Sequence, residues 1–308
     1  MTTGPDALIL HQYEISPFSE KVRVAMGIKG TYWHACNQPA IMPKPEMVRL
    51  TGGFRRIPVL QVGADLYFDS QLIIEELDRR APSPSAFAGS GIGVAGAFAR
   101  WSDGELFMAV VGLLFGGDWD YDAAFLADRS TLIGQAFDPE QMAAAATGLV
   151  PQLRMHLDLV ETQLADGRAF LMGEQADAVD AAVYCQVLFI RWGKGRTAKL
   201  LEDFPLLCAW AKRVGALGHG DRQRDVEREE AIEIARAATP APIAAGSDDL
   251  TFSPGDAVSV RYHDANTPVL EGTLLRIDRR SLTLRPDRSE AGEIHIHMPR
   301  TVGALSKR

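Results

Sequence analysis

The sequence predicts three segments in succession: a small α/β domain, an all-helical domain and a small all-β barrel. Strand-like and helix-like patterns alternate over residues 1–82, nearly everything is helix-compatible over 92–237, and apolar residues alternate with a period of two over 248–308. Two stretches rich in Pro, Ser, Ala and Gly, 82–93 and 239–247, read as linkers. The length of 308 residues agrees, because one ordinary domain has roughly 100 to 200 residues.

The first segment predicts the element order βαβ, loop, ββα. Ser16 precedes Pro17 and an apolar helical face, which is typical of an N-cap followed by proline at the first helical position. Asp69 or Ser70 caps the last helix of this segment. The predicted strands cover 7–13, 31–36, 57–63 and 65–68, with the last two joined tightly around Gly63.

The second segment predicts helices throughout, and no strand pattern competes there. The candidates cover 95–114, 149–166, 177–192, 205–214 and a charged helix at 225–238. Asp177 followed by Asp180 resembles a helix-starting capping box, which is a folding feature.

The third segment predicts a small antiparallel barrel of four or five strands. Val258, Val260 and Tyr262 alternate with polar residues, and so do Ile294 and Ile296. Between residues 248 and 308 nine basic residues balance nine acidic ones, so the whole net charge of -8 lies in the preceding part.

Composition excludes several classes of protein. A net charge of -8, from 32 basic and 40 acidic residues, argues against nucleic acid as a main partner. The longest strongly apolar run, 107–115, is shorter than the ~18 to 20 residues that cross a bilayer. Three cysteines are too few for a disulfide framework, and the first residues do not resemble a secretion signal. We therefore expect a cytoplasmic protein that binds neither membrane nor nucleic acid.

Three motifs resemble one known family. The stretches YEISPFSEKVRVAM, RRIPVL and DSQLIIEEL occur in the order and approximate spacing of the amino-terminal domain of cytosolic glutathione transferases, in particular their omega-like and zeta-like branches. The resemblance covers about residues 7–237 and implies a thioredoxin-like domain that binds glutathione. It also implies a helical domain that supplies the electrophile pocket, and a homodimer. The last segment lies outside the resemblance.

The resemblance places Ser16 where such enzymes carry their catalytic serine or cysteine. A hydroxyl there would donate a hydrogen bond to the glutathione sulfur, and the positive potential of the helix N-terminus would add to it, so both favour the thiolate. A purely capping Ser16 is the alternative, and Ser19 and Tyr13 are runner-up donors. Cysteine is absent between Leu8 and Trp33, which disfavours a thiol-disulfide reductase. Cys36 reads as an apolar core residue.

The same resemblance implies the glutathione contacts. It implies a cis bond before Pro58, which would turn the Ile57 backbone toward the cysteinyl part of the ligand. Ser70 and its amide suit the γ-glutamyl carboxylate, and Asp69 the α-amino group, although the family more often has Glu before this Ser. Phe18 is a further expected contact. Lys44 and Arg56 are candidate cations for the glycyl carboxylate, and a solvated surface charge is an equal alternative for each. Arg55 is a weaker candidate.

The second substrate is expected against the aromatic-rich helix that carries Trp101, Phe107 and Met108, although for any one of the three a place in the helical core is favoured. Two motifs compete with this interpretation. Gly91, Gly93 and Gly96 match GxGxxG, but no strand precedes them, so a dinucleotide site is not expected.

A second competing motif is the pair of histidines near the carboxyl end. His295 and His297 share one face of a strand, and His263 would have to reach them by folding. An exposed strand face is therefore favoured over a metal site, and no metal is expected.

We expect a detoxifying transferase in which the glutathione thiolate, stabilised by Ser16, attacks an apolar electrophile to give a thioether. Glutathione is then a co-substrate. A non-catalytic binding or assembly module that uses the barrel is the alternative, and a glutathione-dependent isomerase or dehalogenase is another.

Overall fold

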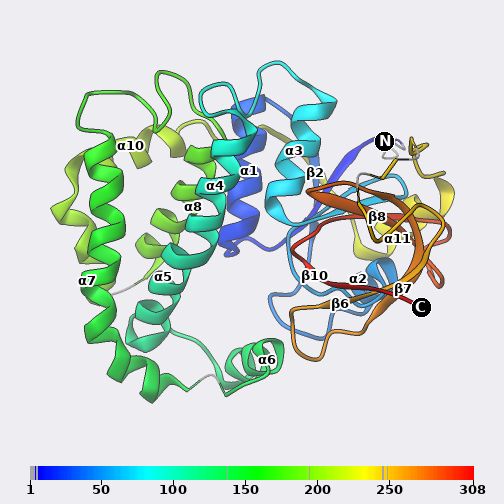
Figure 1. Cartoon of the computed structure of the whole chain (residues 1–308). Coiled ribbons are helices and arrows are strands. Elements are labelled where there is room, and N and C mark those ends of the chain that lie inside the picture. The colour runs from blue at the N-terminus through cyan, green and yellow to red at the C-terminus, as the bar shows by residue number, and fades with distance from the viewer. Residues whose placement is uncertain (1–3, 5, 137, 194, 245, 248) are drawn as a thin grey trace.

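The computed structural model describes residues 4, 6–136, 138–193, 195–244, 246–247 and 249–308. The chain forms a long sheet on one side and a body of helices on the other, with α1 (Pro17–Lys29) between them (Figure 1). In the described part of the chain, no helix is long and apolar enough to span a membrane.

The first part has the predicted order of elements. It comprises β1 (Leu8–Gln12), α1, β2 (Tyr32–Asn37), α2 (Pro45–Thr51), β3 (Val59–Val62), β4 (Asp65–Phe68) and α3 (Ser70–Arg80). Strand β1 pairs in parallel with β2 and antiparallel with β3, and β3 pairs antiparallel with β4. This is a thioredoxin-like arrangement, and α1 and α3 cover one face of it through buried Val22, Met26 and Ile73.

The helical part begins with a nearly continuous rod. It consists of α4 (Gly91–Trp101), a π-helical turn η1 (Ser102–Leu106), α5 (Phe107–Leu113) and a second π-helical turn η2 (Leu114–Asp118). The remaining elements are α6 (Ala123–Ile133), α7 (Pro139–Gln163), α8 (Ala178–Trp192), α9 (Gly195–Lys199), the 3-10 helix η3 (Leu200–Asp203) and α10 (Pro205–Gly215). Helix α8 packs directly on α1, so the helices and the sheet share an interface.

The predicted capping box at the start of α8 is confirmed. The Asp177 carboxylate accepts from the backbone N–H of Val179, and the Asp180 carboxylate accepts from the backbone N–H of Asp177. Asp180 also accepts from Trp210 Nε1 at 2.7 Å, which ties α10 to this helix start.

One strand contradicts the sequence prediction of an all-helical stretch. Strand β5 (Asp221–Asp225) follows α10 and pairs in parallel with β2 of the first part. Its sequence, Asp-Arg-Gln-Arg-Asp, has no apolar residue and therefore no alternation to detect. The predicted charged helix follows as α11 (Arg228–Ala237), and it packs against α2 and the sheet through Ile232 and Ala235.

The last five strands form a sheet, but the predicted closed barrel is wrong for the described residues. They are β6 (Ala257–Tyr262), β7 (Leu270–Ile277), β8 (Ser281–Pro286), β9 (His295–Pro299) and β10 (Gly303–Lys307). Their order is β10-β6-β7-β8-β9, and β9 then pairs in parallel with β4 instead of with β10. The result is one open ten-stranded sheet that ends in β10 and β5.

The last strands and the first part also share a hydrophobic core. Leu66 and Phe68 of β4 lie in the same buried cluster as Val258, Leu284 and Ile296 of the last strands. Phe54 stacks on Phe68 with ring centroids 4.1 Å apart, and the same Phe54 ring contacts Tyr262 at 5.1 Å. Removing the last strands would therefore expose a large apolar surface of the first part.

Candidate functional site

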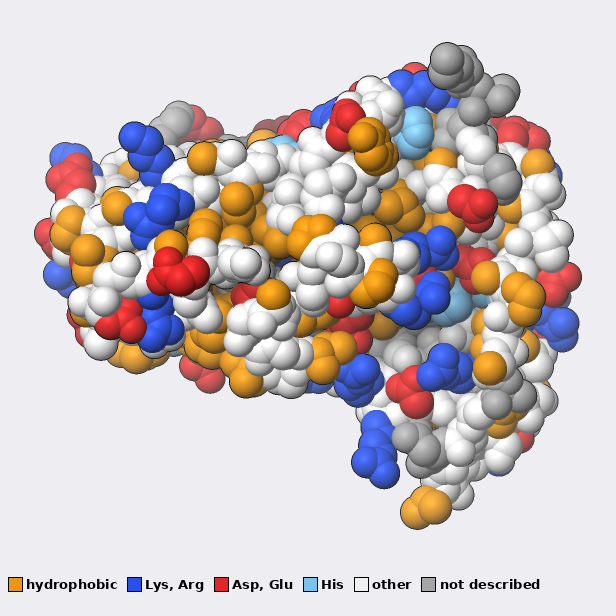
Figure 2. All heavy atoms as spheres, turned by 90° about the horizontal axis from the view of Figure 1, so that it is seen from above, with side chains coloured by type: hydrophobic (Ala, Val, Ile, Leu, Met, Phe, Trp, Pro, Cys, Tyr) orange, Lys and Arg blue, Asp and Glu red, His pale blue; other side chains and the backbone are white. Residues whose placement is uncertain are grey.

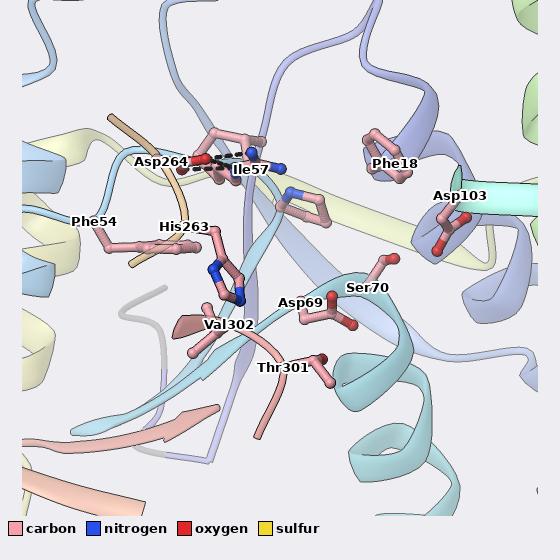
Figure 3. A pocket seen from close by; sticks show the side chains of 12 residues that line it. Phe18, Phe54, Ile57, Asp69, Ser70, Asp103, His263, Asp264, Thr301 and Val302 are labelled. Carbon is pink, nitrogen blue, oxygen red and sulfur yellow. Dashed lines mark hydrogen bonds and ion pairs between the residues drawn. The ribbon is translucent and has the colours of Figure 1, made fainter. Parts of the chain in front are cut away.

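A cavity of about 380 Å³ lies where the first part, the helical rod and the last strands meet (Figure 3). Its walls come from the start of α1, the loop before β3, the start of α3, the η1 turn and the two loops that follow β6 and β9. The lining residues are Phe18, Phe54, Arg56, Ile57, Pro58, Asp69, Ser70, Asp103, His263, Asp264, Thr301 and Val302. Six of the residues predicted from the sequence are therefore brought together: Phe18, Arg56, Ile57, Pro58, Asp69 and Ser70.

The predicted cis bond between Ile57 and Pro58 is confirmed. Pro58 directly precedes β3, and Ile57 lies in the core cluster that the first part shares with the last strands. The backbone at this point is therefore held by packing on both sides.

Asp69 and Ser70 form the beginning of α3. Asp69 has φ of 79°, and its Oδ1 accepts from the backbone N–H groups of Gln71 at 2.8 Å and Leu72 at 3.4 Å. Ser70, the first helical residue, is buried. The partial positive charge of a helix N-terminus favours a carboxylate of a ligand at this end of the cavity.

Asp103 of η1 is a lining residue that the sequence analysis missed. Its Oδ2 accepts from Lys21 Nζ at 2.7 Å, and the Lys21 side chain is fully buried. Burial alone would lower the pKa of Lys21, but the Asp103 carboxylate beside it raises that pKa, so Lys21 stays a cation. Asp103 Oδ1 is buried and meets no hydrogen-bond donor among the described residues. The only signal in the sequence is an acidic residue inside an apolar helical stretch.

Ser16 is the N-cap of α1, as predicted. Its Oγ accepts from the backbone N–H of Ser19 at 3.1 Å, and its side chain is almost completely buried. Ser16 is not among the residues that line the cavity, although Phe18 two residues later is. Ser19 Oγ is buried and has no hydrogen-bond partner in the described part of the chain. The Tyr13 ring lies 5.8 Å from Lys44 Nζ.

The three candidate cations have different surroundings. Lys44 is buried and donates to the carbonyl of Arg55 at 3.2 Å, and burial together with the charges of Arg129 and Arg55 lowers its pKa to about 8. Arg55 forms a buried ion pair with Asp128 of α6. Arg56 lines the cavity, and its Nε donates to both carboxylate oxygens of Asp264, at 2.8 and 2.6 Å. Lys44 and Arg55 do not line the cavity.

Trp101 and Met108 also lie outside the cavity lining. Trp101 donates from Nε1 to His156 Nδ1 of α7 at 3.1 Å, and the Met108 side chain is largely exposed. Phe107, between them, contacts the cavity lining, because the centroid of its ring lies 4.9 Å from that of Phe18. An apolar wall therefore stands next to the start of α1.

The two competing motifs have structural roles. Gly91, Gly93 and Gly96 lie within α4, with no strand before them. The expected exposed face of His295 and His297 is wrong, because both side chains approach Asp65 of β4, at 3.7 and 2.8 Å. Among the described residues, no group of three or more His, Cys, Asp and Glu side chains could hold a metal ion.

A second cavity of about 690 Å³ lies between α3, residues 241–244 and the strands β7 to β9. Acidic and basic side chains both line it, among them Glu75, Asp278, Arg79 and Arg280. On the face shown in Figure 2, Lys and Arg side chains are likewise interspersed with Asp and Glu, so neither sign of charge covers a large area. This mixture is unlike a nucleic-acid-binding surface.

Comparison with known proteins agrees with this geometry. Residues 10–85 match the amino-terminal domain family of glutathione S-transferases, and residues 119–220 match a domain family of unknown function. No curated protein matches the chain. Among solved structures, a GST-like protein from Pseudomonas syringae has 33% sequence identity and a TM-score of 0.80, covering 98% of this chain and 100% of that chain.

Other structures match a smaller share of the chain. The Tau class glutathione S-transferase from mango, Mangifera indica, has 18% identity and a TM-score of 0.53, covering 69% of this chain and 90% of that one. A glutathione S-transferase from Rhodospirillum rubrum has 20% identity and a TM-score of 0.51, covering 68% and 88%.

A thioredoxin-like sheet, a helical body packed on it and a cavity at the cis-proline define a protein of the glutathione transferase type. With a relative that is 33% identical over its full length, the chain belongs to the glutathione transferase family. The extra strands after residue 248 fall within the part covered by the Pseudomonas protein.

Proposed function

We propose that the protein binds glutathione in the 380 Å³ cavity and conjugates it, through its thiol sulfur, to an apolar electrophile. The observation that carries this proposal is that the cis Ile57–Pro58 segment and the start of α3 line the same cavity. These are the groups expected to hold the cysteinyl and γ-glutamyl parts of the ligand. Membership of the glutathione transferase family supports the choice of ligand.

Charges at the α3 end support a place for the γ-glutamyl group. Its α-carboxylate would accept from the Ser70 amide and hydroxyl at the helix N-terminus. Its α-ammonium would lie by Asp69 and Asp103, and it would supply the donor that buried Asp103 Oδ1 lacks. We therefore add Asp103 to the residues expected to contact glutathione.

The sulfur is proposed to lie at the start of α1, near Ser16. Ser16 Oγ already accepts from the Ser19 N–H, which leaves its own proton available to donate to a thiolate. The N-terminus of α1 adds positive potential, and both effects lower the pKa of the thiol. The thiolate then forms a carbon–sulfur bond with the electrophile, which either loses its leaving group or takes up a proton after addition. Phe18 and Phe107 supply the apolar surface for this second substrate.

The test combines calorimetry with reduced glutathione and a conjugation assay. We expect binding at millimolar or tighter concentration, and we expect Ser16→Ala to lose at least about tenfold in kcat. Ser16→Thr retains both the hydroxyl and the helix cap, so it serves as the matched control and should keep most of the activity. Equivalent Ser19→Ala and Tyr13→Phe variants identify the donor if Ser16→Ala is fully active. No detectable binding of glutathione would overturn the proposal.

A non-catalytic binding module is the second candidate. It is favoured by the burial of Ser16 and by its absence from the cavity lining. This candidate predicts glutathione binding without turnover on a broad panel of electrophiles, including substrates of isomerisation and dehalogenation. Measured turnover that depends on Ser16 would eliminate it.

We also propose that the protein is a homodimer, as the family resemblance implies. Ile92 and Val94 of α4 and Met108 of α5 are exposed apolar side chains that such a contact would bury. Light scattering coupled to size exclusion tests this, and a mass of 33.6 kDa at micromolar concentration would show a monomer instead.

A further inference from the structure

The last strands contribute four residues to the cavity: His263 and Asp264 after β6, and Thr301 and Val302 before β10. The two loops are held together, because the backbone N–H of His263 donates to the carbonyl of Val302 and Tyr262 pairs with Gly303 across the strands. Figure 3 shows His263 and Val302 pointing into the same space as Asp69 and Thr301. The cavity is therefore completed by a region outside the usual two parts of such a protein.

The loop that carries Asp264 is also fixed to α6. The backbone N–H of Ala265 donates to the carbonyl of Leu132 at 3.0 Å, and Asn266 Nδ2 donates to the carbonyl of Thr131 at 3.0 Å. The Asp264 side chain is only 5% exposed, whereas that of Arg56 is 56% exposed. Asp264 is thus a rigidly placed, buried acceptor, and the side chain of Arg56 reaches across to it.

The ion pair with Asp264 engages Arg56, the cation of the cavity that would otherwise bind a ligand carboxylate. Arg56 is the only lysine or arginine that lines the cavity in the described part of the chain. Its Nε is engaged by both oxygens of Asp264. The other carboxylates of the lining, Asp69 and Asp103, lie at the opposite, α3 end.

We propose that Asp264 is a specificity-determining residue that selects thiol tripeptides whose terminal carboxyl group is blocked as an amide. The inference rests on the proposed glutathione site. With the γ-glutamyl group at Ser70 and the cysteinyl group at Ile57, the third residue extends toward Arg56 and Asp264. A free glycyl carboxylate there meets the Asp264 carboxylate and has to compete with it for Arg56. An amide has no charge to repel, and its N–H donates to Asp264.

The experiment compares reduced glutathione with its glycyl amide by calorimetry on the full-length protein. In the wild type, the amide is expected to bind about tenfold more tightly than glutathione, because only glutathione places a second carboxylate at Asp264. In Asp264→Asn, Arg56 is released, so glutathione is expected to gain about tenfold and the preference to disappear or reverse. Glu293→Gln is the matched control, because it removes one negative charge from the same region at an exposed position, outside the cavity lining. It should retain the wild-type preference.

Equal or tighter binding of glutathione by the wild type would overturn the inference and leave the proposed function standing. An Asp264→Asn variant with the wild-type preference would overturn it as well. If neither thiol binds, the proposed function fails and the inference fails with it. The wild-type comparison decides the matter even if Asp264→Asn does not fold, and a thermal melt of each variant establishes which have folded.

Discussion

His297 Nε2 and Asp65 Oδ1 lie 2.8 Å apart, although 232 positions separate them in the sequence. The second Asp65 oxygen accepts from the backbone N–H of Ala241 at 2.7 Å. On its other side, the His297 ring hydrogen-bonds Thr283 Oγ1 and stacks on Tyr67, with ring centroids 4.3 Å apart. One buried carboxylate therefore joins β4, β9 and the connection that leads to the last strands.

Replacing Asp65 by alanine should lower the free energy of unfolding by about 2 to 4 kcal/mol, because two partly buried hydrogen bonds to the buried Asp65 carboxylate are lost. Chemical denaturation measures this. Asp287→Ala is a matched control, since that carboxylate is a partly exposed partner of Arg308 and should contribute less than about 1 kcal/mol. Equal losses in both variants would show that the Asp65 contacts do not stabilise the junction.

Ending the chain at residue 247 should destabilise the first part as well as remove the last strands. The deletion opens the edge of β4 and uncovers buried Leu66 and Phe68. We expect loss of a cooperative thermal transition, or aggregation in sedimentation runs, with the full-length chain as reference. A truncated protein that melts cooperatively at the temperature of the full chain would mean that the two regions fold independently.

His11 should make the protein less stable in mild acid. Burial lowers the pKa of His11 to about 4, although the hydrogen bond with Gln61 acts in the opposite direction. Gln61 Nε2 donates to two carbonyls, so its Oε1 accepts from His11 Nε2, and His11 is held as the neutral ring. The folded state then binds fewer protons than the unfolded state between about pH 4 and 6.5. The stability that neutral His11 contributes is fully present above pH 6.5. It decreases by up to about 1.4 kcal/mol per pH unit as the pH falls from 6.5 toward 4.

Denaturation midpoints measured from pH 7 to pH 4 test this effect of His11. His11→Gln should flatten the dependence, whereas the same substitution at exposed His263 should preserve the slope. A wild-type slope in His11→Gln would assign the acid sensitivity to other groups.

Two variants separate the structural and ligand-binding roles of Asp103. Asp103→Asn leaves buried Lys21 without its counter-charge, so we expect a loss of about 3 to 5 kcal/mol in unfolding free energy and weaker glutathione binding. The double variant Lys21→Met with Asp103→Leu removes both charges and should recover much of that stability. Glutathione binding should stay weak, because the acceptor for the α-ammonium is still missing. Recovered binding in the double variant would show that Asp103 acts only through Lys21.

Local patterns predicted the parts of the fold that local interactions decide. The Ser16 cap, the Asp177 and Asp180 box and the strands of the first part each depend on a few neighbouring residues, and all are present. The cis bond before Pro58 came from the family resemblance and is also present.

Features that depend on distant pairing were not predictable in this way. The parallel pairing of β9 with β4 is set by the complementarity of two surfaces more than 200 residues apart, and the alternation within β9 contains no information about its neighbour. For the same reason, the sequence placed Arg56 at the site without its partner Asp264 and did not identify Asp103 at all.

Strand β5 also affects how the protein behaves at high concentration. An uncovered β2 would present a row of free backbone N–H and C=O groups, beside the 70% exposed side chain of Tyr32, to any other chain. β5 covers that row with a strand of five residues, four of which are charged, so another strand that added to the new outer edge would have to take these charged side chains out of water. A segment without a single apolar residue therefore protects this end of the ten-stranded sheet from edge-to-edge aggregation.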